Sequence, residues 1–143
     1  EQLADWITEN RFHICHWFMV DDLNHLRRGG RISSVAAIAG SALGIKPILH
    51  IDEEGKLIPI YKVRGRKKGM ERLIACLEET IIPAETDMMF IVHGDCKEDA
   101  KELKQMIKSK MHGKDIQIEY VGPIIGAHTG PGILAVVYFG TKR

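Results

Sequence analysis

MMFIVHGDCKEDAKELKQMIKSKMHGKDIQIEY, residues 88–120, joins two strand patterns through a helix pattern. Residues 88–92 are an apolar run of strand length, and residues 116–120 alternate apolar with polar side chains. Between them, residues 97–110 repeat apolar side chains every three or four positions, with lysines on the opposite face. Strand and helix patterns that alternate along one chain predict an α/β fold.

The same two spacings continue on both sides of this stretch. One-sided apolar patterns predict helices, and alternation or short apolar runs predict strands. The further predicted elements are a helical segment at residues 1–10, a strand at 12–20, a short helix from 23, an apolar helix at 35–43, strands at 45–51 and 57–63, a helix at 68–82 and a strand at 133–139. The fold class is therefore α/β, a two-layer single domain over residues 1–143 with a mixed β-sheet covered by helices.

Local turn chemistry sets several of the expected boundaries. Asp21 or Asp22 is expected to cap the short helix, and Gly29 to end it in the left-handed conformation. Gly55 lies in the turn between residues 45–51 and 57–63, where a positive φ closes a hairpin. Pro83 forbids continuation of the helix before it.

Composition narrows the classes of function. The 143 residues carry 20 Lys and Arg against 19 Asp and Glu, and a net charge of +1 gives no whole-surface attraction to nucleic acid or anionic membranes. Apolar runs such as residues 132–139 are far shorter than the roughly 20 residues of a membrane span. Three irregularly spaced cysteines favour free thiols, so we expect a cytoplasmic protein without a signal peptide. A start at Glu1, inside a helical pattern, predicts a fragment of a longer chain.

Residues 27–34, RRGGRISS, contain the first candidate anion site. They place Arg31 beside the expected start of the apolar helix. A guanidinium next to free helix N–H groups suits a carboxylate or a phosphate. The alternative is an ordinary glycine-ended helix junction with a solvated arginine, which these residues alone favour by roughly two to one.

Residues 122–132, GPIIGAHTGPG, contain the second candidate site and predict a glycine-rich turn. Glycines such as Gly126 let the backbone approach a ligand, while His128 and Thr129 add an imidazole and a hydroxyl. Backbone N–H groups in such a turn can form an anion nest. A plain connection before the last strand, with a satisfied loop histidine, explains the segment about equally well.

A third segment, RGRKK at residues 64–68, gathers four cations at a strand-to-helix junction. The helix dipole disfavours cations at a helix start, so the run suggests a partner-docking patch through Arg64 and Arg66. A solvated charged turn is about as good an explanation. Nucleic acid is disfavoured as the partner, because the net charge is near zero and aromatic residues are few.

The histidines and cysteines do not predict a metal site. His13, Cys15, His16, His93 and Cys96 lack the tight paired spacings of zinc ligands, which leaves a metal at about one chance in ten. The glycine loops of nucleotide-binding proteins and the nucleophile elbow of hydrolases do not occur in the sequence. We therefore expect neither a metal ion nor an organic cofactor.

Four ordered segments resemble the DegV family of fatty-acid-binding proteins: DDLNHLRRGGRIS (21–33), IKPIL (45–49), RGRKK (64–68) and GPIIGAHTGPG (122–132). The resemblance extends from about residue 12 to the end of the chain. It implies a two-domain protein that encloses one long-chain fatty acid in an apolar tunnel between its halves. This chain resembles the C-terminal half, without the N-terminal domain.

The resemblance also implies roles for particular residues. The carboxylate is expected to meet Ser and Thr side chains of the absent N-terminal domain together with His128, with Arg31 beside the cleft. Thr129, Gly126 and Ile125 belong to the same motif and are expected to contact the fatty acid. The tunnel is expected to be lined by Ile32, Ala36, Ile38, Ala39 and Leu43.

A carrier rather than an enzyme follows from the resemblance. Some members present the bound acid to a fatty acid kinase, and Arg64 and Arg66 resemble the region that faces it. Each buried CH₂ contributes about 0.8 kcal/mol, so a sixteen-carbon chain supplies on the order of 12 kcal/mol, against roughly 1.5 to 3 for a charged hydrogen bond. The alternative is an enzyme for a small phosphorylated or carboxylated molecule, with His128 as general acid or base and Arg31 as an oxyanion clamp.

Overall fold

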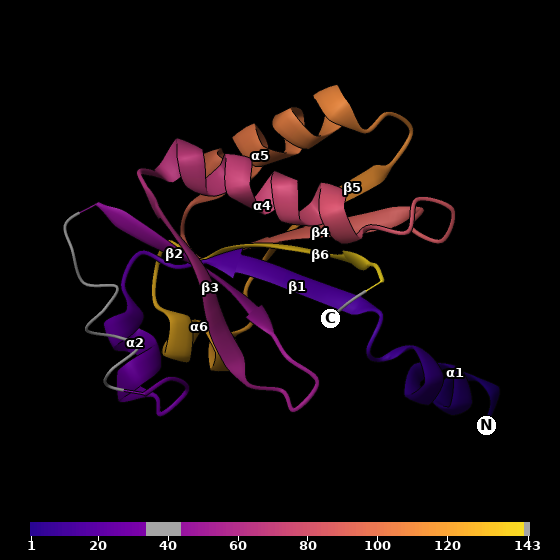
Figure 1. Ribbon diagram of the computed structural model, residues 1–143, viewed down its shortest axis with the longest axis horizontal. Helices are drawn as coiled ribbons and strands as arrows, with labels where there is room; N and C mark the ends of the chain where they lie inside the picture. The colour runs from indigo at the N-terminus through magenta and orange to yellow at the C-terminus, as the bar shows by residue number, and fades with distance from the viewer. Residues whose placement is uncertain (34–43, 142–143) are drawn as a thin grey trace.

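The computed structural model describes residues 1–33 and 44–141, which form a two-layer α/β domain (Figure 1). The expected mixed sheet is present, and its strand order is β3-β2-β1-β6-β4-β5. Its strands are β1 (Ile14–Met19), β2 (Ile45–Ile51), β3 (Leu57–Arg64), β4 (Met88–His93), β5 (Asp115–Tyr120) and β6 (Leu134–Phe139). The helices are α1 (Gln2–Asn10), α2 (Leu23–Arg28), α4 (Arg66–Thr80), α5 (Lys97–Lys110) and α6 (Pro123–Thr129).

The centre of the sheet joins distant parts of the chain. β1 pairs antiparallel with β6 over its whole length, from Ile14 opposite Phe139 to Met19 opposite Leu134. β2 and β3 form the predicted antiparallel hairpin, and Gly55 in its turn has a φ of +79°. β4 and β5 run parallel and are connected by α5, because parallel strands require a crossover.

Helices α4 and α5 cover one face of the sheet (Figure 1). Their apolar stripes point at the strands, so the larger of two hydrophobic clusters fills the space between the layers. Its fully buried members include Met19, Ile48, Leu73, Leu77, Met89, Ile91, Leu103, Ile107, Leu134 and Val136.

Helices α2 and α6 pack together on the opposite face, at one end of the sheet (Figure 1). Successive strand side chains point to opposite faces, so Phe18 belongs to this side whereas its neighbour Met19 belongs to the other. The second cluster is formed by Phe18, Val20, Leu23, Leu26, Leu49, Ile133 and Ala135. The helix predicted at residues 35–43 lies outside the described residues.

Several predicted boundaries agree with the structure to within two residues. Asp22 caps α2 by accepting a hydrogen bond from the backbone N–H of Asn24 at 2.8 Å. α4 begins two residues before its predicted start, directly after Gly65, whose φ is +91°. It ends two residues before its predicted end, because Ile81 is extended and pairs with Gly140.

The end of α2 differs from the expectation. Gly29 was expected in the left-handed conformation, but its φ is −77°, and Gly30 has the positive φ of +69°. The N–H of Gly30 donates to the carbonyl of Arg27 at 2.9 Å, and the N–H of Arg31 donates to that of Leu26 at 2.8 Å. These two bonds form a Schellman motif, in which the left-handed residue lies one position beyond the cap.

α1 extends away from the sheet at the N-terminal end of the described chain (Figure 1). None of its residues is buried, and Leu3, Trp6 and Ile7 expose more than half of their surface. The Trp6 ring lies 6.4 Å from that of Phe139. Among the helices of residues 1–33 and 44–141, none is both long and apolar enough to cross a bilayer.

Candidate functional site

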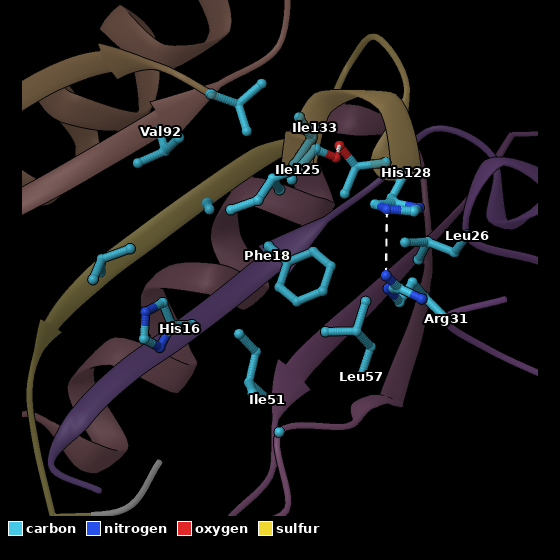
Figure 2. Close-up of a pocket in the computed structure, with 15 residues that line it drawn as sticks. His16, Phe18, Leu26, Arg31, Ile51, Leu57, Val92, Ile125, His128 and Ile133 are labelled. Atoms are coloured by element: carbon cyan, nitrogen blue, oxygen red, sulfur yellow. Dashed lines mark hydrogen bonds between the residues drawn. The ribbon is translucent and has the colours of Figure 1, made fainter. Parts of the chain in front are cut away.

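A pocket of about 420 Å³ lies on the sheet face that carries α2 and α6 (Figure 2). Its floor includes Phe18 of β1 and Ala135 of β6, and Ile51 and Leu57 of the hairpin contribute one side. Most of the lining is aliphatic or aromatic, and the described lining residues include neither a carboxylate nor a thiol. Such a surface suits an aliphatic ligand.

Arg31 and His128 meet at one end of the pocket although 97 positions separate them in the sequence (Figure 2). The Nη2 atom of Arg31 lies 3.4 Å from Nε2 of His128. A guanidinium can only donate, so Nε2 is the acceptor in this contact. Arg31 also donates from Nη1 to the carbonyl of Gly29 at 3.1 Å. This end of the pocket is suited to an anionic group.

The segment that carries His128 is a helix rather than the predicted glycine-rich turn. Pro123 occupies its first position, where a fixed φ favours the helix and no N–H is required. The helical spacing of three and four residues brings Ile125, His128 and Thr129 to the pocket. The turn expectation was therefore wrong for residues 123–129.

Four of the five predicted ligand-contact residues line this one pocket: Arg31, Ile125, His128 and Thr129. The Thr129 hydroxyl donates to the carbonyl of Ile125 at 2.9 Å, so its proton is committed within α6. The fifth residue, Gly126, lies on α6 but is not among the lining residues. Its N–H also bonds within this segment, so it does not contribute to the anion nest expected of a turn.

Of the five predicted tunnel-lining residues, the structure describes only Ile32. Ile32 packs against the cluster that contains Phe18 and Leu26, but it is not among the lining residues of the pocket. Ala36, Ile38, Ala39 and Leu43 lie outside the described residues, so their role stays a prediction.

Sequence reasoning assigned no site role to much of the pocket floor. The signal available was strand alternation, because residues two apart on one strand share a face. To predict the pocket floor from this alternation, one must also know which strands are neighbours in the sheet. The strand residues missed in this way are His16, Phe18, Ile51, Leu57, Val92, Ala135 and Val137.

The histidines and cysteines weighed as metal ligands do not assemble. His16 lies in the pocket lining, whereas the ring of His93 packs against that of Tyr120 with the centroids 4.3 Å apart and the planes tilted by 52°. The described part of the chain holds no group of three or more His, Cys, Asp or Glu side chains placed to bind a metal ion.

The two arginines of the RGRKK segment differ in their surroundings. Arg64 is exposed at the end of β3. Arg66 donates from Nε to Asp99 at 2.6 Å and from Nη1 to Asp21 at 3.0 Å and to the Gly132 carbonyl at 2.6 Å. Its Nη2 lies 3.1 Å from Sγ of Cys96. The Arg66 side chain therefore holds α4, α5 and the segments around β1 and β6 together.

The thiols are poorly suited to nucleophilic chemistry. Burial raises the pKa of Cys76 to about 11. Burial also raises the pKa of Cys96, although the neighbouring Arg66 opposes this effect. Because the thiolate is the reactive form, raised pKa values leave both groups protonated near neutral pH.

The sequence and the fold of this chain resemble those of known proteins. The model of a family described as "Uncharacterised protein, DegV family" matches residues 1–141. The chain belongs to the DegV family. A DegV domain-containing protein of Clostridium perfringens is 47% identical over 143 residues, which are 100% of this chain and 49% of that protein.

Solved structures of DegV proteins share the fold of this DegV chain. The fatty acid binding DegV family protein from Streptococcus agalactiae superposes with a TM-score of 0.82 at 34% identity, over 99% of this chain and 50% of that one. DegV, a fatty acid binding protein from Bacillus subtilis, gives a TM-score of 0.77 at 32% identity, over 98% and 49%. The chain thus spans about half the length of the relatives it matches.

Proposed function

We propose that this DegV chain binds part of a long-chain fatty acid in an apolar cleft, with the carboxylate at the Arg31–His128 end. The observation that carries the proposal is that one pocket combines an aliphatic lining with a guanidinium and an imidazole at one end. The names of the Streptococcus agalactiae and Bacillus subtilis relatives, both fatty acid binding proteins, support the same ligand class.

The two parts of the pocket contribute differently to affinity. At about 0.8 kcal/mol per buried CH₂, the aliphatic lining supplies most of the binding free energy. A charged hydrogen bond at the polar end adds roughly 1.5 to 3 kcal/mol. The polar end therefore fixes which end of the ligand lies beside Arg31, and the lining determines how tightly it is held.

The proposal includes a second domain. This chain spans about half of its relatives' length, and the family resemblance implies that an N-terminal domain completes the cleft and supplies hydroxyl groups to the carboxylate. In the full protein the fatty acid is thus shared between two halves, of which this chain is the C-terminal one.

Presentation of the bound acid to a fatty acid kinase remains part of the proposal. Of the two arginines predicted to face such a partner, Arg64 is exposed and can contact it. Arg66 is already engaged with Asp21 and Asp99, so it would act by supporting the surface rather than by direct contact.

The pocket favours a carrier over the alternative enzyme. A general acid or base requires a partner that orients it or exchanges its proton. The hydrogen-bond partner of His128 in the described residues is Arg31, a permanent cation, and no carboxylate lines the described pocket. A carrier needs neither a proton-exchanging partner for His128 nor a carboxylate in the pocket.

Substitution of His128 tests the proposed function. In the full-length protein that carries this domain, we expect His128→Ala to weaken palmitate binding about tenfold, because Arg31 loses the acceptor that holds its guanidinium at the carboxylate end of the pocket. Equilibrium titration with palmitate measures the effect. His112→Ala is the matched control, since His112 is an exposed histidine of the α5–β5 connection.

Two outcomes would contradict the proposal. One is a full-length protein that neither binds palmitate nor yields a fatty acid when its natively purified form is extracted and analysed by mass spectrometry. The other is an unchanged palmitate affinity in His128→Ala. Turnover of a small phosphorylated or carboxylated substrate that is lost with His128 would favour the enzyme instead.

A further inference from the structure

Gly29 ends α2 with a backbone conformation that does not require glycine. Its φ is −77° and its ψ is 0°, which any residue other than proline adopts without strain. The residue that needs glycine for its backbone is Gly30, with a φ of +69°. A different reason must account for the absence of a side chain at position 29.

The reason lies in the space beside Gly29. A Cβ atom built there would lie 2.2 Å from Nδ1 of His128 and 3.2 Å from two carbons of the same ring. These distances are far below van der Waals contact, so the imidazole occupies the volume that a side chain would fill. Helices α2 and α6 pack together at this point.

We propose that Gly29 is a positioning residue for the ligand, because its missing side chain seats the His128 ring with Nε2 toward Arg31. This inference rests on the proposed function, in which the Arg31–His128 pair meets the carboxylate. With Nδ1 against the end of α2, the ring presents its other nitrogen to Arg31 at the polar end of the pocket. Gly29 thus sets the direction of the imidazole without touching the ligand.

A methyl group at position 29 is expected to displace the ring rather than the backbone. The N–H of Gly29 donates to the carbonyl of His25 at 3.0 Å, and its carbonyl accepts from Arg31. The imidazole, in contrast, can change its position by rotation about two side-chain bonds. Relief of the clash therefore moves Nε2 away from Arg31 while the helices stay in place.

The test compares Gly29→Ala, His128→Ala and the double variant in the full-length protein, with palmitate and hexadecanol as probes. Gly122→Ala is the matched control, because Gly122 has a φ of −62° and open space where its Cβ would lie. For Gly29→Ala we expect palmitate affinity to fall about tenfold and hexadecanol affinity to change less than about twofold, since only the acid carries the charge. Adding Gly29→Ala to His128→Ala should cause no further loss, because both changes remove one interaction.

A second measurement follows the ring directly. The ¹⁵N chemical shifts of the His128 imidazole should change in Gly29→Ala and stay unchanged in Gly122→Ala. This readout remains informative even if the wild-type protein binds no palmitate, so failure of the proposed function is distinguishable from failure of the positioning role.

Several results would overturn the inference. Unchanged His128 shifts in Gly29→Ala would show that the ring is not displaced. Equal losses of palmitate and hexadecanol, or losses that add fully in the double variant, would indicate general disruption of the pocket. A Gly29→Ala protein that does not fold while Gly122→Ala does would mean that the backbone, not the ring, accommodates the methyl group.

Discussion

Arg64 and Arg66 are two positions apart and carry the same charge, yet the structure gives them different tasks. Arg66 is 21% exposed and donates to two carboxylates and a backbone carbonyl, whereas Arg64 is exposed. A planar guanidinium meets several acceptors at once, which a lysine ammonium cannot reproduce in the same geometry. Both arginines were predicted to form one docking patch, because charge alone does not reveal an internal partner.

We predict that Arg66→Ala lowers the free energy of unfolding by about 2 kcal/mol, since it leaves Asp99 and the Gly132 carbonyl without their donor. Arg64→Ala should change it by less than about 0.5 kcal/mol, as is usual for exposed sites. Urea denaturation of the two variants measures the difference. Equal effects would argue against the internal role of Arg66.

At the level of elements, the junction after α2 shows how a helix end delivers a functional side chain. The Schellman motif turns the chain at Gly30 and fixes the backbone of Arg31 through its bond to Leu26. The guanidinium then reaches His128 on α6. The polar end of the pocket therefore depends on the C-terminal Schellman motif of a six-residue helix.

Gly30→Ala should destabilise the protein by about 1 kcal/mol, because a residue with a Cβ is strained at a φ of +69°. Gly122→Ala should change stability by less than about 0.5 kcal/mol, since its φ of −62° suits alanine. Thermal and denaturant unfolding curves of both variants provide the measurement. A fully stable Gly30→Ala would imply that the left-handed turn contributes nothing to the fold.

Elements with strong local signals were predictable from sequence. The hairpin around Gly55, the capped start of α2 and the amphipathic α5 each depend on neighbouring residues, and all are confirmed. α6 was missed because four glycines and prolines near His128 indicated a turn, whereas Pro123 at the first helical position and packing against α2 favour a helix.

Only part of the candidate site was predictable from the sequence, because the rest depends on the pairing of distant strands. Arg31 and His128 were predicted as site residues from their chemistry and from the family resemblance. Their meeting, and the floor formed by Phe18 and Ala135, depend on β1 and β6 being neighbours at the centre of the sheet. No local pattern encodes that pairing, because it joins the two ends of the chain.

For the whole molecule, the exposed apolar side chains support the proposed second domain. Ile124 and Ile125 on α6 are 78% and 57% exposed, and Leu3 on α1 is 71% exposed. Neighbouring exposed aliphatic groups such as Ile124 and Ile125 are typical of surfaces that meet another partner. α6 carries two of them directly beside the pocket.

We predict that the isolated chain binds the neutral apolar dye Nile red more strongly than the full-length protein does, with excess palmitate present in both samples. Fluorescence titration measures this difference. Ile124→Ser should reduce dye binding by the isolated chain and leave the full-length protein unchanged. Equal dye binding by the two forms would indicate that this surface stays uncovered in the longer protein.

The pairing of β1 with β6 also determines when the sheet becomes complete during synthesis of the chain. β6 leaves the ribosome after every other strand of the sheet, and it is the only described strand that touches both β1 and β4. Before it emerges, no strand pairing joins the ribbon β3-β2-β1 to the ribbon β4-β5. The pocket floor between β1 and β6 is thus complete only after residue 139 has been made, and a chain cut short before residue 134 lacks the strand that joins the two ribbons.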